Sequence, residues 1–258
     1  MTRCHHRVKS VSQDADGVYA DRFAGRYLIA ADGLHSQVRR QTGLLSARPR
    51  KHARYGSRRH YRVAPWSDSV QVYWSHRCEA YVTPVAPDTV GVAILHKKPG
   101  NYDDLMSDFP QLKARLKDPV SKLRGAGPFD QKTQARVEGR ILLIGDAAGY
   151  LDPITGEGIA ISVRTAMSAI AAIRADEPRS YESSWRKVTR TYYVLTHLLL
   201  AAGRRPFLRR NLVQLTAAFP SVFGFVLGLL GGRGQPRIET KNEEPNEGIT
   251  RFRLSEET

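Results

Sequence analysis

Polar and apolar residues alternate over residues 16–31, "DGVYADRFAGRYLIAA", and then become continuously apolar. Alternation is typical of β-strands, so we predict a hairpin that turns through Gly25 and continues as a strand over residues 26–31. The strand ends at Asp32 and Gly33. A short helix is expected from Ser36 to about Thr42, stopped by Gly43.

A β-rich segment follows between residues 55 and 95. It holds four strand-like runs, "RRHYRVA", "SVQVYWS", "EAYVTPV" and "DTVGVAIL", joined by short turn sequences. Short connections between neighbouring strands imply an antiparallel sheet. Residues 101–117 then predict a helix broken at Pro110, and "GRILLIG", residues 139–145, predicts a further strand.

Two helices are predicted in the C-terminal half. The first spans residues 157–174 and is apolar on most sides, so we expect it to be buried. The second spans residues 180–202 and is closed by Gly203. The polar residues 236–258 are predicted to be disordered.

Charge and cysteine content narrow the class of protein. The chain has 258 residues and a formal net charge of +15, which favours anionic partners. We find no zinc-finger spacing and no RNA-binding aromatic signature, so we expect no nucleic acid partner. Cys4 and Cys78 share no spacing motif, and residues 1–30 hold no signal peptide pattern, so we expect a cytoplasmic protein. "CHH" at residues 4–6 cannot converge on a metal, because adjacent strand residues point to opposite faces.

The stretch "GDAAGYLDPITGEG", residues 145–158, joins the predicted strand to the first C-terminal helix. Such a junction directs unpaired backbone N–H groups at whatever lies in front of the helix. Gly156 and Gly158 let a flat or bulky group approach the backbone closely. Asp146, at the carboxyl end of a strand, is placed to accept hydrogen bonds from ribose-like hydroxyls. Pro153 stiffens the turn.

This stretch resembles the second flavin-binding signature of FAD-dependent enzymes with the para-hydroxybenzoate hydroxylase fold. That superfamily includes class A flavoprotein monooxygenases and geranylgeranyl reductases, and the "TGEGI" ending resembles the geranylgeranyl reductase-like branch. "ADGLHSQVRR", residues 31–40, resembles the Asp-Gly motif between the two halves of the flavin site in the same family. The two motifs occur in the family's order.

The resemblance implies FAD as the cofactor, with NAD(P)H as the electron donor. Asp146 would bind the ribityl or ribose part, Pro153 would face the isoalloxazine, and N–H groups of residues 156–159 would meet its pyrimidine edge. Arg39 or Arg40 would reach a phosphate, although a solvated helix face is the alternative for at least one of them. The implied cofactor-binding residues are Asp32, Gly33, Arg39, Gly145, Asp146, Ala147, Ala148, Pro153, Gly156, Glu157, Gly158 and Ile159. We predict no catalytic side chain, since such enzymes use the chemistry of their cofactor.

One part of the family's pattern is missing from the sequence. The family opens with a strand–GxGxxG–helix unit that holds the FAD pyrophosphate, and no GxGxxG occurs here. An N-terminally truncated chain, a separate chain that supplies the βαβ unit, and a decaying gene are the alternatives. Without the unit, strand edges and apolar surface should be exposed and FAD affinity should be badly weakened. We therefore expect the isolated chain to purify colourless.

These observations predict a mixed α/β fold: a truncated FAD/NAD(P)-binding Rossmann-like domain with an inserted antiparallel substrate sheet and C-terminal helices. Residues 1–50 and 136–176 would form the remaining FAD-binding domain. Residues 51–135 would form the substrate domain and residues 177–235 the C-terminal helices. The predicted function is reduction or monooxygenation of a hydrophobic substrate, with an isoprenoid as the candidate. A remnant without cofactor, a partner-dependent binding protein and a basic membrane-surface protein are the alternatives.

Two further features of the sequence each allow more than one interpretation. Tyr61, Tyr73, Trp74 and Tyr81 fall on the predicted sheet, where they either line a substrate pocket or pack in the core. Residues 211–232 carry no formal charge and follow the arginines of "RRPFLRR". They predict either packed C-terminal helices, a peripheral contact of residues 204–232 with the inner face of a membrane, or a poor membrane-spanning helix.

Overall fold

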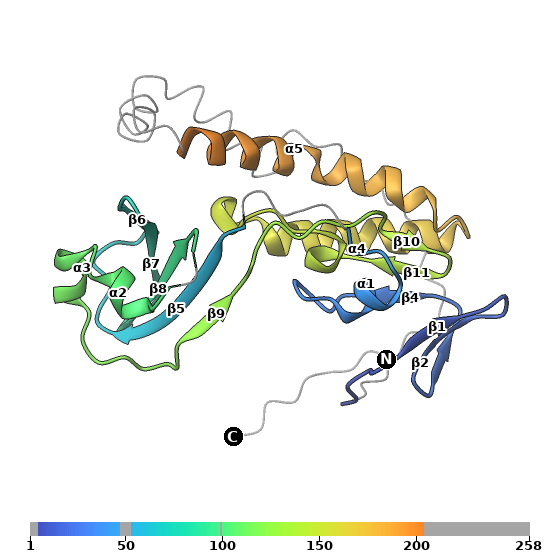
Figure 1. Cartoon of the computed structure of the whole chain (residues 1–258), viewed down its shortest axis with the longest axis horizontal. Coiled ribbons are helices and arrows are strands. Elements are labelled where there is room, and N and C mark those ends of the chain that lie inside the picture. Colours follow the sequence, from blue (N-terminus) through green and yellow to red (C-terminus); the bar gives the residue numbers. More distant parts are fainter. Residues whose placement is uncertain (1–4, 47–52, 99, 204–258) are drawn as a thin grey trace, which may run out of the picture. The chain divides into compact units, whose positions relative to one another are not determined.

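The computed structural model of the chain describes residues 5–46, 53–98 and 100–203 (Figure 1). The chain divides into one compact unit, Met1–Leu212, and a second, Val213–Thr258, and the described residues all belong to the first. The mixed α/β class is as predicted, and the described residues form three sheets. The uncharged stretch at 211–232 and the tail at 236–258 lie outside the described residues. Within the described part of the chain, no helix has the length and hydropathy needed to cross a bilayer.

The N-terminal hairpin turns earlier than predicted. β1 (Val11–Gln13), β2 (Val18–Ala20) and β3 (Phe23–Gly25) form an antiparallel sheet, and Ala20 pairs with Phe23. The turn therefore lies at Asp21 and Arg22, and the prediction of a turn at Gly25 is wrong. Asp21 adopts a φ of 50°, and its carboxylate accepts hydrogen bonds from the backbone N–H groups of Lys9 and Ser10. An aspartate can thus supply a turn where the sequence pattern favours a glycine.

The next two elements match their predictions. β4 (Leu28–Ala30) lies inside the predicted strand, and α1 (Gln37–Gln41) lies inside the predicted short helix. Ser36 caps α1, since its hydroxyl oxygen accepts a hydrogen bond from the N–H of Arg39. Gly43 follows with a φ of 71°, which ends the helix as expected.

A small sheet holds the parallel pair of strands that matters for the site. Its order is β10 (Val137–Glu138), β11 (Ile141–Leu143) and β4, and β11 runs parallel to β4. Carboxyl ends of parallel strands meet at one edge of a sheet. β4 is the last strand, and within the described residues its outer edge pairs with no other strand.

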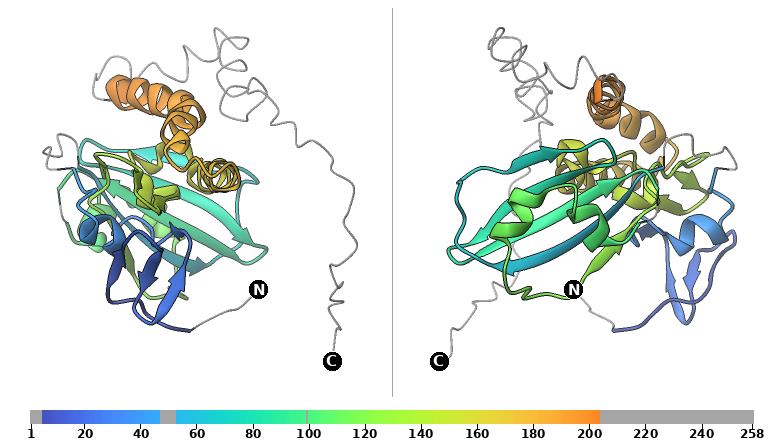
Figure 2. Two further views of the ribbon diagram at one scale, coloured as in Figure 1. Left: turned by 90° about the vertical axis from the view of Figure 1, so that its right-hand side faces the viewer. Right: turned by 60° about the vertical axis from the view of Figure 1, so that its left-hand side comes forward.

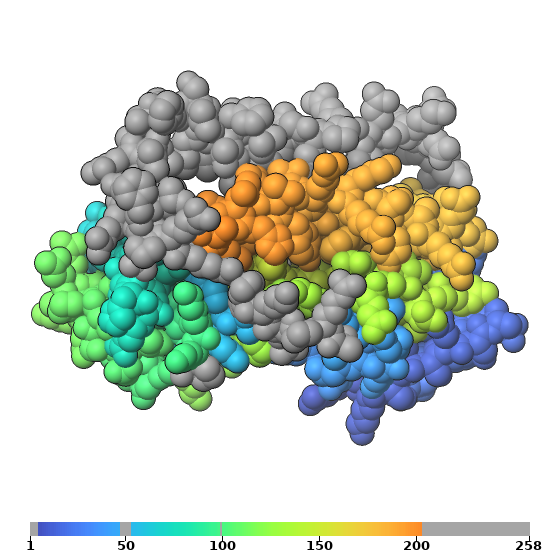
Figure 3. Space-filling view, turned by 45° about the horizontal axis from the view of Figure 1, so that its top comes forward, coloured from blue at the N-terminus to red at the C-terminus, as the bar shows by residue number. Residues whose placement is uncertain are grey.

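α4 (Gly158–Arg174) and α5 (Ser180–Gly203) pack against each other, and Figure 3 shows α5 in gold and orange on the surface. The prediction that α4 is buried on most sides is wrong. Its small residues Thr165, Ala169 and Ala172 are buried, whereas the larger apolar side chains of the opposite face are exposed. This exposed stripe consists of Ile159, Val163, Met167 and Ile170. Small residues on this side let α4 pack closely, with Ile161 as a larger buried side chain, and the four residues of the stripe lie on the opposite side.

The large antiparallel sheet confirms the four predicted strand runs. β5 (Tyr55–Arg62), β6 (Gln71–Trp74), β7 (Cys78–Ala86), β8 (Thr89–His96) and β9 (Arg124–Ala126) pair in the order β6-β7-β8-β5-β9. α2 (Tyr102–Met106) and α3 (Pro110–Arg115) lie between β8 and β9 in the chain, and the helix is interrupted before Pro110 as predicted. Figure 2 shows these two helices on one face of the broad sheet.

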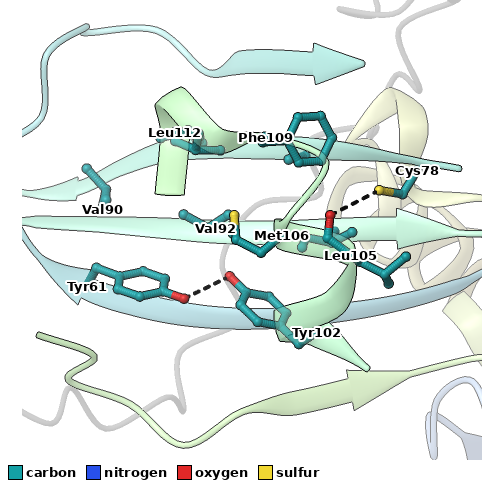
Figure 4. Packing of buried hydrophobic residues seen from close by; sticks show 12 residues of the cluster. Tyr61, Cys78, Val90, Val92, Tyr102, Leu105, Met106, Phe109 and Leu112 are labelled. Carbon is teal, nitrogen blue, oxygen red and sulfur yellow. Dashed lines mark hydrogen bonds between the residues drawn. The ribbon is translucent and has the colours of Figure 1, made fainter. Parts of the chain in front are cut away.

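The core of this domain lies between the sheet and α2 and α3 (Figure 4). Val90, Val92 and Ile94 of β8 point to it, and side chains from both helices fill it. The Tyr61 hydroxyl donates a hydrogen bond to the Tyr102 hydroxyl, 3.3 Å away. Since strand residues alternate between faces, Gly91, Ala93 and Leu95 lie on the opposite face. We call that face of the sheet, which carries Arg58, Val72, Trp74, Tyr81, Ala93 and Arg124, the open face.

Candidate functional site

The structure brings the two motifs of the sequence together at one sheet edge. Leu143 pairs with Ala30, and the Ile144 N–H donates to the Ala30 carbonyl at 3.0 Å. Asp32 and Gly33 follow one strand, while Gly145 and Asp146 follow the other. We call residues 145–159, from the end of β11 to the start of α4, the corner.

Arg39 connects the two motifs through its buried guanidinium group. Nη1 donates hydrogen bonds to the carbonyl oxygens of Asp146 and Ala147, at 3.2 and 2.9 Å. Nη2 donates to the carbonyl oxygen of Leu34 and to Oε1 of Gln131. Arg39 is only 1% exposed, so it does not lie on a solvated helix face, and its guanidinium bonds to protein oxygens rather than facing a phosphate site. Arg40, its neighbour in α1, is exposed.

Asp32 and Gly33 shape the entrance to α1. Oδ2 of Asp32 accepts hydrogen bonds from the N–H groups of Gln37 and Val38, at 2.7 and 3.1 Å. Gly33 adopts a φ of 76°, and its carbonyl accepts from the Ser36 N–H. The Asp-Gly motif thus turns the chain from β4 into α1 and brings Arg39 to the corner.

Gly145 begins the corner in a conformation that requires glycine. Its φ is 53°, and its N–H donates to Oγ1 of Thr165 in α4 at 3.1 Å. A Cβ at this position would lie 2.6 Å from Oγ of Ser162. The absent side chain therefore lets α4 pack directly behind the end of β11. Ala147 and Ala148 are fully buried, so the structure places them in the core behind the corner and not on its surface.

Asp146 presents a carboxylate with free acceptor capacity. The residue is half-buried, and within the described part of the chain its carboxylate accepts no hydrogen bond. Burial raises the pKa of Asp146, and the positive charge of Arg39 opposes the rise. A partly buried carboxylate without donors is stabilised by any hydroxyl or amide donor that a ligand brings.

The start of α4 has backbone donors for which the described residues supply no partner. The 3-10 turn Pro153–Thr155 precedes it, and Gly156 follows with a φ of 71° and open space around its α-carbon. The Gly156 N–H donates to the Pro153 carbonyl at 3.0 Å, so it is not among the free donors. Glu157 caps α4 without a side-chain hydrogen bond. For the N–H groups of residues 157–159, the described residues supply no acceptor.

Gly158 and Ile159 differ in their surroundings. A Cβ on Gly158 would meet the Tyr150 ring at 3.8 Å, an ordinary contact, so packing within the chain does not demand a glycine there. Ile159 is 83% exposed. The backbone of the first turn of α4 is therefore accessible from solvent. Such a helix N-terminus favours negative charge or an electron-rich edge.

A buried ionic network, which the sequence analysis missed, joins the corner to the large sheet. Arg54 Nη2 donates to Oε2 of Glu79 at 2.6 Å, and Arg54 Nη1 lies 3.6 Å from Oδ1 of Asp152. The Tyr81 hydroxyl also donates to Glu79, and the Tyr192 hydroxyl donates to the Asp152 carbonyl. Asp152 directly precedes Pro153, and its carboxylate caps the turn by accepting a hydrogen bond from the Ile154 N–H. An aspartate before a proline is a local sequence signal for a turn, so sequence patterns could have indicated Asp152. Nothing local in the sequence marks Arg54 or Glu79.

Asp152 makes stability depend on pH. Burial raises its pKa from 3.8 to about 6, and the charge of Arg54 opposes the rise. The folded state therefore binds this proton more tightly than the unfolded state. Its contribution to stability is complete below pH 3.8 and is lost as pH rises through about 6.

We predict that the free energy of unfolding of the wild type, minus that of Asp152→Asn, falls as pH rises from about 4 to 7. The fall should be at most about 3 kcal/mol. The amide does not titrate, so other groups cancel in the comparison. Urea unfolding at a series of pH values measures the difference, with the exposed Asp68→Asn as the matched control. A difference that grows with pH would contradict the prediction and would mean that pairing with Arg54 outweighs burial.

Comparisons with known proteins identify this arrangement. The FAD binding domain family matches residues 2–176 of the chain. The chain belongs to this family. The predicted flavoprotein class is thereby confirmed. Both motifs lie within the matched residues, so their adjacency at one sheet edge belongs to the FAD binding domain.

Individual relatives span several chemistries. A digeranylgeranylglycerophospholipid reductase of Methanococcus vannielii is 30% identical over 155 residues, covering 54% of this chain and 38% of that protein. A dialkyldecalin synthase of Streptomyces rugosporus is 25% identical over 271 residues, covering 90% of this chain and 56% of its own length. The chain thus spans about four-tenths to six-tenths of the relatives it matches.

Solved structures show the same fold. The flavin-dependent brominase Bmp2 superposes with a TM-score of 0.68 at 20% identity, covering 87% of this chain and 64% of that chain. The Diels-Alderase PyrE3 gives a TM-score of 0.65 at 22% identity, covering 87% and 55%. At these identities the likeness concerns the fold alone, so the branch of the family stays a prediction.

Proposed function

We propose that this chain forms the larger, C-terminal part of an FAD-dependent oxidoreductase and that the corner holds the flavin. The observation that carries this proposal is the exposed first turn of α4. Its N–H groups at residues 157–159 have no acceptor within the described chain, and the open space at Gly156 lies beside them. The half-buried carboxylate of Asp146, which accepts no hydrogen bond from any described residue, supplies a second site for a polar ligand.

These residues fit FAD. Asp146 would accept hydrogen bonds from hydroxyls of the ribityl or ribose part, and the N–H groups of residues 157–159 would meet the pyrimidine edge of the ring. When bound, FAD supplies the redox chemistry. The start of α4 stabilises negative charge at that edge through its free N–H groups and its dipole. Arg39 holds both motifs in place through the carbonyls of Asp146 and Ala147.

The substrate we propose is a hydrophobic molecule, with reduction of isoprenoid double bonds ahead of monooxygenation and NAD(P)H as the electron donor. The name of the Methanococcus vannielii relative, a reductase of an isoprenoid lipid, supports reduction. Exposed Val72 and Trp74 on the open face support an apolar substrate. A cytoplasmic location, with a peripheral membrane contact through residues 204–232, belongs to the same proposal.

The proposal includes a βαβ unit with GxGxxG, either from the same gene or from a partner chain. The outer edge of β4, which pairs with no strand among the described residues, and the exposed stripe of α4 support it, because both are surfaces of the kind that folded domains cover. In-frame translation of the DNA upstream of Met1 tests whether the same gene encodes this unit.

We predict that the chain purifies colourless and that fusion behind a GxGxxG βαβ unit restores FAD binding, followed by flavin absorbance. NADPH added to the fused form should bleach that absorbance.

In the fused form, Asp146→Ala should weaken FAD binding about ten-fold or more, because hydrogen bonds to a charged group contribute about 1.5–3 kcal/mol. Asp68→Ala is the control and should bind FAD as wild type does.

Two outcomes would contradict these expectations. Stoichiometric yellow flavin on the isolated chain would show that the missing unit is not needed for affinity. A folded fused form that binds no FAD would remove the flavoenzyme function and leave a remnant without cofactor.

A further inference from the structure

We propose that the open face binds a single anionic amphiphile, with its charged group at Arg58 and Arg124 and its apolar part over Val72 and Trp74. This inference deepens the proposed function, on which it rests, by naming the chemical class of the substrate. The open face is joined to the corner through packed side chains. Phe129 packs at Gly56, its ring contacts the Tyr150 ring edge-on at 5.7 Å, and Tyr150 in turn adjoins Gly158.

The proposed site follows one row of residues across the sheet. Val72 of β6 pairs with Tyr81 of β7, and Tyr81 pairs with Ala93 of β8. Ala93 pairs with Arg58 of β5, and Arg58 pairs with Arg124 of β9. Residues in register across strands share a face, so the row runs from apolar to cationic.

The apolar end of the row is exposed although the strand is ordered. Val72 and Trp74 are each 40% exposed on β6, and they alternate with the inward-facing Tyr73. Tyr73 packs edge-on against Phe109 on the core side. Val72 and Trp74 are two positions apart on one face of β6, so together they offer an exposed apolar surface that an apolar ligand can cover.

Among the described residues, the cationic end of the row has no carboxylate as a counter-ion. Arg58 and Arg124 lie directly opposite each other on neighbouring strands, an arrangement that is unfavourable for like charges. Among the described residues, neither forms an ion pair with a carboxylate, and Arg58 Nη1 contacts only Nε2 of His60, at 3.4 Å. The carboxylate of Glu79, on the same face, is occupied by Arg54 and Tyr81. An anionic group would therefore relieve the repulsion between the two arginines.

The dimensions select a molecule with a head and a tail. From β5 to β6 the sheet spans three strand spacings, roughly 14 Å at about 4.8 Å each. In between, Tyr81 and Ala93 line the row, and the side chains of His60 and Val85 adjoin Gly91, so an apolar body would lie across the Tyr81 ring and over Ala93. The ligand is thus an apolar molecule of that order of length with one anionic end.

The test uses two fluorescent probes and the chain as it is, without FAD. 8-Anilinonaphthalene-1-sulfonate is anionic and aromatic, whereas N-phenyl-1-naphthylamine has the same aromatic frame without the sulfonate. We expect the double variant Arg58→Gln/Arg124→Gln to bind the anionic probe about five- to ten-fold more weakly and the neutral probe within about two-fold of wild type. Lys113→Gln, on α3 at the other side of the sheet, removes one charge and should change neither affinity.

Two further measurements locate the probe. Trp74→Phe keeps the apolar surface and should lower the energy transfer from tryptophan to the bound anionic probe, while Trp66, which donates a hydrogen bond to Gln71 of β6, supplies the remainder. Val163→Ser, in the exposed stripe of α4, should leave both affinities unchanged. If the double variant unfolds, the salt dependence of the wild type replaces it, and binding of the anionic probe alone should weaken as salt rises.

The proposal is overturned if the wild-type chain does not bind the anionic probe, or if the arginine variants weaken both probes equally. It is also overturned if Val163→Ser, and not the arginine variants, abolishes binding. Because no flavin is present, such a failure leaves the FAD titration of the fused form untouched, and the two proposals can fail separately.

Discussion

Gly145→Ala should destabilise the chain by about 3 kcal/mol, measured by urea unfolding. A φ of 53° costs a residue with a Cβ roughly 1–2 kcal/mol. The new methyl group would also lie 2.6 Å from Oγ and 3.2 Å from Cβ of Ser162, and overpacking of this kind costs about 1–3 kcal/mol. Because α4 packs behind the corner at this point, we expect relief of the contact to displace the first turn of the helix.

Gly156→Ala is the matched control for this prediction. Gly156 has a φ of 71°, but a Cβ there meets no atom within 4 Å, so only the backbone cost of about 1 kcal/mol remains. Ser162→Gly should recover part of the stability lost in Gly145→Ala, since it removes the atoms in conflict. Equal losses for Gly145→Ala and Gly156→Ala would show that Ser162 does not crowd Gly145.

Arg39→Leu should destabilise the chain by about 4 kcal/mol in the same measurement. The guanidinium donates four hydrogen bonds from a buried position, and leucine leaves the four oxygen acceptors without these donors. The lost hydrogen bonds involve both motifs, because Leu34 belongs to residues 31–40 while Asp146 and Ala147 belong to residues 145–158. Gln131 supplies the fourth acceptor. We therefore expect the variant to lose the fixed position of Asp146 as well as stability.

Arg40→Leu provides the control, since Arg40 is exposed in the same helix and should change stability by no more than about 0.5 kcal/mol. Arg39→Lys should fall between the two, because one ammonium group cannot span the acceptors that the planar guanidinium reaches. If Arg39→Leu is as stable as wild type, the guanidinium does not hold the two motifs together.

Sequence patterns predicted the elements that depend on local information. The four strand runs, the break at Pro110 and both long helices follow from alternation, helical periodicity and terminating residues. The adjacency of residues 31–40 and 145–158 was accessible only through the family resemblance, and the parallel pairing of β4 and β11 now explains it.

Features that depend on distant partners were not predictable. The turn at Asp21 is held by N–H groups of residues 9 and 10, and the exposed stripe of α4 depends on which neighbours the helix has. From the sequence, Arg39 is one of two adjacent arginines on a short helix, and nothing local distinguishes it from Arg40. Its acceptors come from distant parts of the chain. The network of Arg54, Glu79 and Asp152 likewise joins residues far apart in the sequence.

The four aromatic residues on the predicted sheet show the limit of pattern alone. All four lie in strand-like sequence, which allows either packing in the core or a position on a ligand-binding surface. The register divides them, since Tyr61 and Tyr73 face α2 and α3 while Trp74 and Tyr81 lie on the open face. Strand alternation could have separated Tyr73 from Trp74, but which face is covered depends on where the helices pack.

Amide hydrogen exchange tests the central claim, that the corner holds the flavin ring at the start of α4, most directly. The measurement compares the chain alone and fused behind a GxGxxG βαβ unit, each with FAD and with ADP, which lacks the ring. We predict that FAD slows exchange at residues 157–159 in the fused form and that ADP does not. Equal protection by ADP, or unprotected amides at residues 157–159 while flavin absorbance reports bound FAD, would contradict it.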